Sequence, residues 1–183
     1  MLDTDTVVVE TLSGPTVERA LDGHALGMVE QTTITGSTMT RRDFLGHYNR
    51  HSLAWLAPEA TPPPLEDFRY YNAGVVLGTR ETLSNLARWA KDMILSSQGD
   101  HQVGAHMIAD QDYFQFWANT LHPGSCTTLP WQWNHCQYWD MDFPRPGAKI
   151  LHFSNFCKGP LRFQVFKVFL ARMMLRLKSH GSL

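Results

Sequence analysis

Runs of hydrophobic and β-branched residues predict the strands of this chain. The strongest run extends from Tyr70 to Gly78 and is typical of a buried strand. Shorter runs of the same kind occupy residues 6–9, 25–29 and 149–153. We therefore expect strands in both halves of the chain.

Between these runs, hydrophobic residues recur with helical spacing. From Arg80 to Ser97 they stand three and four residues apart, which predicts an amphipathic helix, and Thr79 is suited to cap it. Further helices are predicted over 42–56, where Pro58 ends the pattern, from Asp110 onward, and over 161–177. The Gly14–Pro15 pair predicts a turn, and residues 122–139, rich in Trp, predict an ordered loop packed by its aromatic side chains.

The composition is that of an ordinary globular domain with one core. The chain has 183 residues, of which 43% are hydrophobic and 18% are charged, and one domain is normal at this length. Its net charge of −1 gives no overall attraction for nucleic acid. No apolar run approaches the roughly 20 residues of a membrane-spanning helix, and the three cysteines form no Cys-x-x-Cys pair. Any ligand must therefore be recognised by a local site.

The first candidate for such a site is Asp3-Thr4-Asp5. Two carboxylates separated by one residue beside a strand can bind one hard cation, and Mg²⁺ or Mn²⁺ prefers such oxygen ligands. The same pattern is common in solvated surface turns, so it needs support from elsewhere in the chain. Three later segments give that support: Asn72-Ala73-Gly74-Val75, Asp110-Gln111-Asp112, and His152 followed six residues later by Lys158.

In their order and approximate spacing, these four segments resemble the motifs of the family 8 glycosyltransferases, retaining sugar-nucleotide enzymes that include glycogenin and bacterial lipopolysaccharide galactosyltransferases. The resemblance implies an α/β fold of the GT-A (nucleotide-diphospho-sugar transferase) type, with a mixed sheet flanked by helices. It also implies Asp3, Asp5 and His152 as ligands of Mn²⁺ (or Mg²⁺), Lys158 as the diphosphate contact, Asn72, Ala73 and Gly74 as donor-binding residues, and Asp110 and Gln111 as catalytic residues in the sugar pocket.

The residue types suit this chemistry. Breaking the bond between a sugar and a nucleoside diphosphate builds negative charge on the leaving phosphate, which a divalent cation and a Lys ammonium stabilise. An amide and a carboxylate can bind sugar hydroxyls or steady positive charge at the anomeric carbon. Whether Asp110 attacks as a nucleophile or orients the sugar stays open at this point.

Each of these residues also has a structural interpretation. His152 in an apolar strand can be a hydrogen-bonded core histidine, and Asn72 can be a structural amide. Asp110 can be a helix N-cap. A metal-dependent phosphohydrolase would share the metal chemistry, but it would leave Asn72 and Gln111 without a role.

We therefore expect a metal-dependent hexosyl- or pentosyltransferase that moves a sugar from a nucleoside diphosphate sugar to an acceptor with retention. The acceptor would be a glycan, a lipid-linked molecule or a protein, and we expect no nucleic-acid partner. Because the family places a nucleotide-binding half before its Asp-x-Asp motif, we expect residues 1–160 to be the C-terminal part of the domain, with the N-terminal half missing. The alternative is a noncatalytic glycosyltransferase remnant that acts as an interaction module.

Residues 161–183 form a further predicted unit, a basic amphipathic helix and tail. A helix of this kind can lie in an anionic membrane interface, and packing on the missing half is the competing interpretation. The localisation stays open between the Golgi lumen, for a eukaryotic secretory enzyme, and the cytoplasmic face of the membrane, for a bacterial one.

Overall fold

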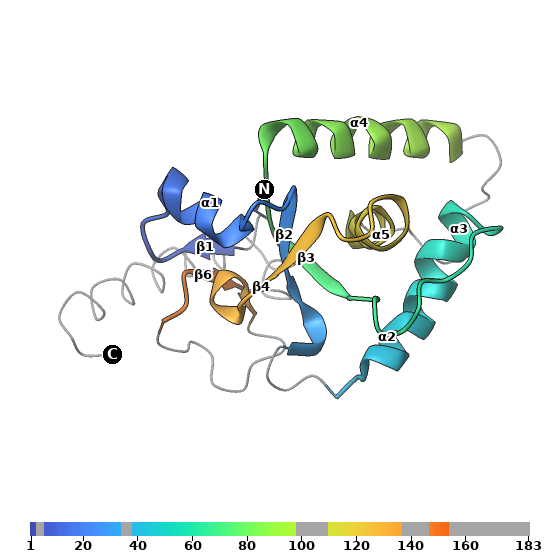
Figure 1. The fold of residues 1–183 in the computed structure, drawn as a ribbon, viewed down its shortest axis with the longest axis horizontal. Coiled ribbons are helices and arrows are strands. Elements are labelled where there is room, and N and C mark those ends of the chain that lie inside the picture. Colours follow the sequence, from blue (N-terminus) through green and yellow to red (C-terminus); the bar gives the residue numbers. More distant parts are fainter. Residues whose placement is uncertain (3–5, 34–37, 98–109, 137–146, 154–183) are drawn as a thin grey trace, which may run out of the picture.

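The computed structural model describes residues 1–2, 6–33, 38–97, 110–136 and 147–153 of the chain. They form an α/β structure with two three-stranded sheets, each of which contains one parallel and one antiparallel pairing (Figure 1). This confirms the predicted α/β class. Within these ranges, no helix is both long and apolar enough to cross a membrane.

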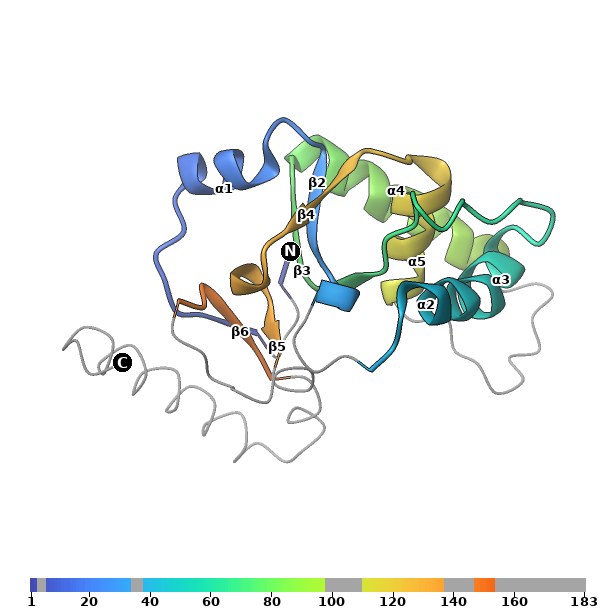
Figure 2. The same cartoon turned by 60° about the horizontal axis from the view of Figure 1, so that its bottom comes forward.

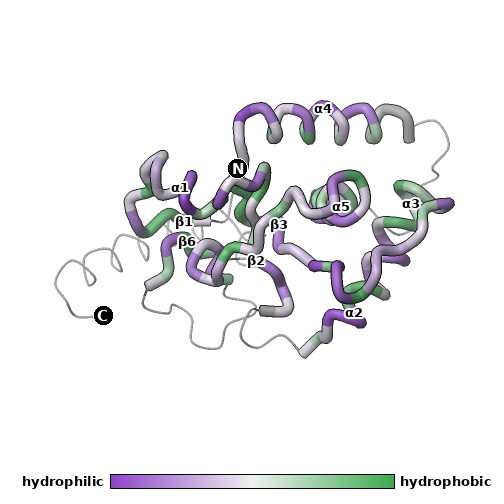
Figure 3. The backbone as a smooth tube through the Cα atoms, in the orientation of Figure 1, coloured by the Kyte–Doolittle hydropathy of each residue, from purple (hydrophilic) through white to green (hydrophobic). Residues whose placement is uncertain are grey.

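The central sheet has the strand order β3-β2-β4. Its strands are β2 (Leu26–Glu30), β3 (Tyr71–Gly78) and β4 (Cys126–Leu129), and β2 runs antiparallel to β3 and parallel to β4. Figure 3 shows hydrophilic and hydrophobic residues in alternation along α4 (Arg80–Ser97). β2 and β3 are buried because both faces of the sheet are covered there, whereas only Leu129 is buried in β4.

Two hydrophobic clusters mark the two faces of the central sheet. The cluster beneath α4 and α5 (Asp110–Phe116) includes Leu26, Met28, Tyr71, Ala73, Leu86 and Phe114. The cluster on the other face, beneath α1 (Gly14–Leu21), includes Leu21, Val29, Val75, Leu129 and Ile150. Ile150 belongs to the second sheet, so the second sheet and α1 together cover this face.

The second sheet has the order β1-β6-β5. Its strands are β1 (Thr6–Val8), β5 (His135–Cys136) and β6 (Ile150–His152). The antiparallel pairing of β1 with β6 sets Thr6 opposite His152, and the parallel pairing of β5 with β6 sets Cys136 opposite the same residue. His152 therefore lies in the middle strand of this sheet, at its end.

The first residues of the chain connect the two sheets. Leu2 forms an antiparallel bridge with Val75, and the Met1 amino group donates to the Val76 carbonyl at 2.6 Å. The β2–β3 register shifts between Gly27 and Val29, so β3 departs from a regular ladder in this same region. Such bulges re-aim side chains and often lie beside functional sites.

The outer edge of β3 is covered by side-chain amides as well. The Gln115 side chain accepts from the Tyr71 N–H at 3.0 Å and donates to the Tyr71 carbonyl. One turn later, Asn119 accepts from the Arg69 N–H at 3.1 Å and donates to the Arg69 carbonyl at 2.9 Å. These amides satisfy backbone groups that an edge strand would otherwise expose, and they fix α5 against β3.

Most of the predicted elements are confirmed, including the strands near the start, at 70–78 and near 150, and the helix from Arg80 to Ser97. The predicted helix over 42–56 appears as α2 (Arg41–Tyr48), a π-helical turn (Asn49–Leu53) and α3 (Ala54–Leu56). The predicted helix over 161–177 lies outside the described residues.

Two local predictions are wrong. Gly14 and Pro15 begin α1 instead of forming a turn, because Pro is tolerated in the first turn of a helix and the Ser13 side chain accepts from the Thr16 N–H. The predicted loop over 122–139 contains β4, β5 and a short 3₁₀ helix (Trp131–Trp133). Its Thr-Thr-Leu segment gains strand structure by pairing with β2, which local sequence does not reveal.

Candidate functional site

Three buried polar side chains from different parts of the chain meet between the two sheets. The Asn134 side chain donates from Nδ2 to Asn72 Oδ1 at 2.7 Å, and its Oδ1 lies 2.9 Å from His152 Nδ1. Asn72 Oδ1 also accepts from the Gly74 N–H at 2.9 Å. We call these four residues the His152 cluster. His152 belongs to β6 and Asn134 directly precedes β5. Figure 2 shows these two strands separately from the β2–β3–β4 sheet.

Gly74 allows the imidazole to lie directly on the β3 backbone. A Cβ added to Gly74 would lie 2.2 Å from His152 Cε1 and 2.9 Å from Nε2, far inside contact distance. Glycine is therefore required here by close approach rather than by a special backbone angle. The structure thus brings together three of the predicted site residues, Asn72, Gly74 and His152.

Ala73 is buried, but its side chain belongs to the hydrophobic cluster under α4 and α5. Because neighbouring strand residues point to opposite faces, this methyl group faces away from Asn72. A donor-binding role for Ala73 would have to use its backbone.

The predicted catalytic residues Asp110 and Gln111 lie at the first turn of α5. The exposed Asp110 carboxylate accepts from the Gln111 N–H at 2.8 Å, and its negative charge at the first turn is favourable to the helix dipole. The Gln111 side chain donates to Gln31 Oε1 at 3.4 Å and hydrogen-bonds the hydroxyl of Tyr70. Burial raises the pKa of Tyr70 to about 12, so this hydroxyl stays protonated at neutral pH.

Gln31 connects the first turn of α5, through Gln111, to the central sheet. Its N–H donates to the Tyr70 carbonyl at 2.7 Å, which places Gln111 beside the start of β3. Asn72 follows Tyr70 by two residues, so the two groups of polar side chains flank the same end of the strand.

The remaining predicted site residues, Asp3, Asp5 and Lys158, lie outside the described residues. The described neighbours of the two aspartates are placed, however: Leu2 lies beside Val75 and Thr6 lies opposite His152. Within the described part of the chain, no group of three or more His, Cys, Asp or Glu side chains is arranged to hold a metal ion.

The chemistry of His152 fits a metal ligand. Metal-bound histidines usually have their other ring nitrogen held by a hydrogen-bond partner that fixes the ring, and Asn134 holds Nδ1 in this way. Nε2 is then the ring nitrogen that would ligate Mn²⁺, and Asp3 and Asp5 are the proposed oxygen ligands.

Sequence reasoning missed Asn134 and Gln31. Asn134 is fully buried, although the sequence predicts a loop for its segment, which is rich in aromatic residues. An asparagine in such a segment must find hydrogen-bond partners when it is buried, but the sequence does not say which.

A second buried polar group surrounds Glu30 at the end of β2. Arg41 Nη2 donates to Glu30 Oε1 at 3.1 Å, Thr32 Oγ1 donates to the same oxygen at 2.6 Å, and Arg69 Nε lies 3.8 Å from Oε2. We call these residues the Glu30 group. It joins β2 to α2 and to the segment before β3, which is a structural role.

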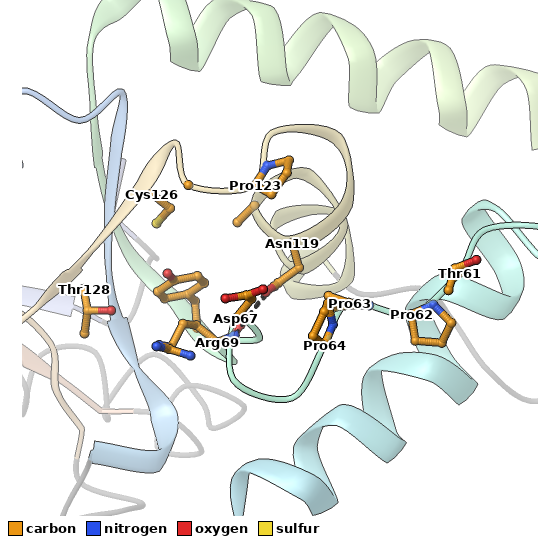
Figure 4. Close-up of a pocket in the computed structure, with 13 residues that line it drawn as sticks. Thr61, Pro62, Pro63, Pro64, Asp67, Arg69, Asn119, Pro123, Cys126 and Thr128 are labelled. Atoms are coloured by element: carbon orange, nitrogen blue, oxygen red, sulfur yellow. Dashed lines mark hydrogen bonds between the residues drawn. The ribbon is translucent and has the colours of Figure 1, made fainter.

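A cavity of about 620 Å³ opens on the α5 side of the central sheet (Figure 4). Tyr71, Arg69 and Asn119 line it, and their polar groups are engaged by internal hydrogen bonds: Arg69 Nη1 with the carbonyls of Glu66 and Phe68, and Asn119 with the Arg69 backbone. Burial raises the pKa of the lining Cys126 to about 12, so its thiol is not a nucleophile at neutral pH.

No protein-family model and no curated protein matches this chain. The interpretation of the site therefore depends on the residues and their geometry.

Proposed function

We propose that this protein is a metal-dependent, retaining glycosyltransferase of the GT-A type, which moves a sugar from a nucleoside diphosphate sugar to an acceptor. The observation that carries the proposal is that Asn72 is linked to His152 by hydrogen bonds through Asn134, and that Gly74 lies directly against the His152 ring. These residues belong to two of the four motifs on which the resemblance depends, and they are far apart in the sequence.

In this proposal, His152 holds the cation together with Asp3 and Asp5. The chain beside Asp3 and Asp5 supports this assignment, because Thr6 pairs with His152 itself. When bound, Mn²⁺ (or Mg²⁺) supplies positive charge that stabilises the leaving diphosphate. Lys158 would add a second positive charge at the diphosphate.

Asn72 would bind the donor through its amide nitrogen. Its oxygen already accepts two hydrogen bonds, from Asn134 and from the Gly74 N–H, so Nδ2 is the group suited to a ligand oxygen. Gln111, held by Gln31 and Tyr70, and the exposed Asp110 would bind sugar hydroxyls at the start of β3.

Thermal unfolding in the presence of nucleoside diphosphate sugars tests the proposal. A ligand that binds only the folded state raises the melting temperature, by mass action. We expect weak binding, so that a panel of uridine, guanosine and adenosine diphosphate sugars at high concentration contains at least one that raises it slightly in the presence of Mn²⁺ and not in the presence of EDTA. His152→Gln should abolish that rise, and His122→Gln, which alters an exposed histidine whose ring lies tilted against Trp117, should retain it. A rise that is equal with and without Mn²⁺ would contradict the proposal.

A further inference from the structure

We propose that Asn134 is a positioning residue that holds His152 as the Nδ1–H tautomer, and that the backbone N–H of Gly74 sets this tautomer through Asn72. The inference rests on the proposed function for its purpose, which is to present the lone pair of Nε2 to a divalent cation. The tautomer itself can be measured without any metal.

The first step is the orientation of the Asn72 amide. A backbone N–H can only donate, so the Asn72 atom that lies 2.9 Å from the Gly74 nitrogen must be the acceptor, Oδ1. This matters because the oxygen and nitrogen of an amide are otherwise distinguished only by their partners.

The second step is the orientation of the Asn134 amide. Asn72 Oδ1 can only accept, so the Asn134 atom at 2.7 Å must be Nδ2. The other end of the Asn134 amide is then its oxygen, and this oxygen faces the ring of His152.

The third step is the histidine. Asn134 Oδ1 can only accept, so His152 Nδ1, at 2.9 Å, must carry the proton. In the neutral imidazole, Nε2 then carries the lone pair, which is the form that ligates metals through Nε2.

Burial makes the chain of hydrogen bonds hard to reverse. Asn72, Asn134 and His152 are 6%, 0% and 5% exposed. Water therefore has little access to replace a lost bond, and turning either amide over would set two acceptors or two donors against each other. Gly74 adds a steric limit, since the ring occupies the space of its absent side chain.

Long-range ¹H–¹⁵N NMR of the histidine rings tests the inference directly. At alkaline pH, where imidazole is neutral, His152 should show a pyrrole-type Nδ1 and a pyridine-type Nε2. The spectrum of His152→Gln identifies its signals among the nine histidines. A wild-type His152 with its proton on Nε2 would overturn the inference, and this outcome needs no variant.

Two substitutions at Asn72 separate the orientation mechanism from simple packing. Asn72→Asp keeps an acceptor opposite the Gly74 N–H and Asn134 Nδ2, so the Nδ1–H tautomer should persist. Asn72→Leu removes that acceptor, so the Asn134 amide can turn over and His152 should shift toward the Nε2–H tautomer. The same tautomer in both variants would contradict the role given to Gly74 and Asn72.

Asn134→Leu is the most direct variant, and Asn119→Leu is its matched control. Asn119 is also a buried asparagine, but it bonds Arg69 and Gln115 and not His152. We expect Asn134→Leu to change the tautomer and to weaken Mn²⁺ binding by about 10–100-fold, as loss of a residue behind a ligand does. Asn119→Leu should change neither, whatever it does to stability. An unchanged tautomer in Asn134→Leu would overturn the inference.

The NMR and Mn²⁺ results also separate this inference from the proposed function. If wild-type His152 is the Nδ1–H tautomer and Mn²⁺ does not bind, the hydrogen-bond chain stands and the proposed function fails. If Mn²⁺ binds through His152 and the tautomer is unaffected by Asn134, the proposed function stands and the positioning role fails.

Discussion

The His152 cluster and the Glu30 group are both buried polar groups at the central sheet. They differ in whether they contain charged side chains that compensate each other. In the Glu30 group, a carboxylate is matched by two arginines and a threonine hydroxyl, so its charge is compensated within the fold. In the His152 cluster, neutral amides orient one imidazole and contribute no charge of their own. A charge-matched group such as the Glu30 group holds elements together, whereas we propose that the hydrogen-bonded chain that ends on His152 prepares a metal site.

The cavity on the α5 side shows why the arrangement of hydrogen bonds is a better indicator of a functional site than the presence of a cavity. This cavity has a volume of about 620 Å³, yet the polar groups of Arg69 and Asn119 on its wall are already bonded to the backbone. The His152 cluster is compact, and its importance lies in the directions of its hydrogen bonds.

Gly74→Ala should have the largest effect. The new Cβ would occupy the position of the His152 ring, so the ring must move, and we expect Mn²⁺ affinity to fall by about a hundredfold. The free energy of unfolding should fall by about 1–3 kcal/mol, as for other overpacked sites. Isothermal titration and urea unfolding measure the two effects.

The double variant Gly74→Ala with His152→Ala sharpens this prediction. Removing the ring should restore most of the lost stability and none of the Mn²⁺ binding. Equal destabilisation in the single and double variants would show that Gly74 acts through the backbone and not through the imidazole.

Glu30→Gln should lower the free energy of unfolding and leave the Mn²⁺ affinity nearly unchanged. The amide loses the charge that Arg41 and Arg69 face, so the free energy of unfolding should fall by about 1.5–3 kcal/mol. Because the Glu30 group is structural, Mn²⁺ affinity should stay within about twofold of wild type. Urea unfolding and titration of the folded variant check both parts, and a large loss of affinity would break the distinction drawn between the two groups.

Tyr70 should make the protein less stable at high pH. Burial raises its pKa to about 12 from 10.0, so between these values the folded state binds more protons than the unfolded state. Stability contributed by this group is therefore present below pH 10 and is lost as the pH rises toward 12, by up to about 1.4 kcal/mol per pH unit. Tyr70→Phe should reduce that slope in urea unfolding at alkaline pH, and an unchanged slope would contradict the assignment.

Ser13→Ala should have the smallest effect. The Ser13 side chain caps α1 by accepting from the Thr16 N–H, and loss of such a cap costs about 1 kcal/mol. Because Ser13 does not belong to the His152 cluster, Mn²⁺ affinity should not change. Ser13→Asp, which keeps a capping acceptor, is the control and should retain the stability of wild type.

The fold was predictable where hydrophobic patterns are long. The buried run Tyr70–Gly78 and the periodic segment Arg80–Ser97 became β3 and α4, because burial on both faces or on one face leaves a clear pattern. Short elements such as β4 were missed, since four residues become a strand only when β2 lies beside them. The division into two sheets was also not visible, because it depends on tertiary pairing.

The candidate site was predictable in part for the same reason. The motif residues Asn72, Gly74 and His152 were identified, and the structure brings them together. Asn134 was not identified, because the sequence gives no sign that its amide bridges two distant motifs. The sequence predicts that a buried amide has hydrogen-bond partners, but the identity of those partners depends on the tertiary structure.

Calorimetric titration of Mn²⁺ into the purified protein tests the central claim most directly. We predict one Mn²⁺ site in the wild type, at least tenfold weaker binding in His152→Gln, and unchanged binding in His122→Gln. Equal Mn²⁺ affinity in the wild type and His152→Gln, or no binding to either, would contradict the assignment of the His152 cluster as a metal site.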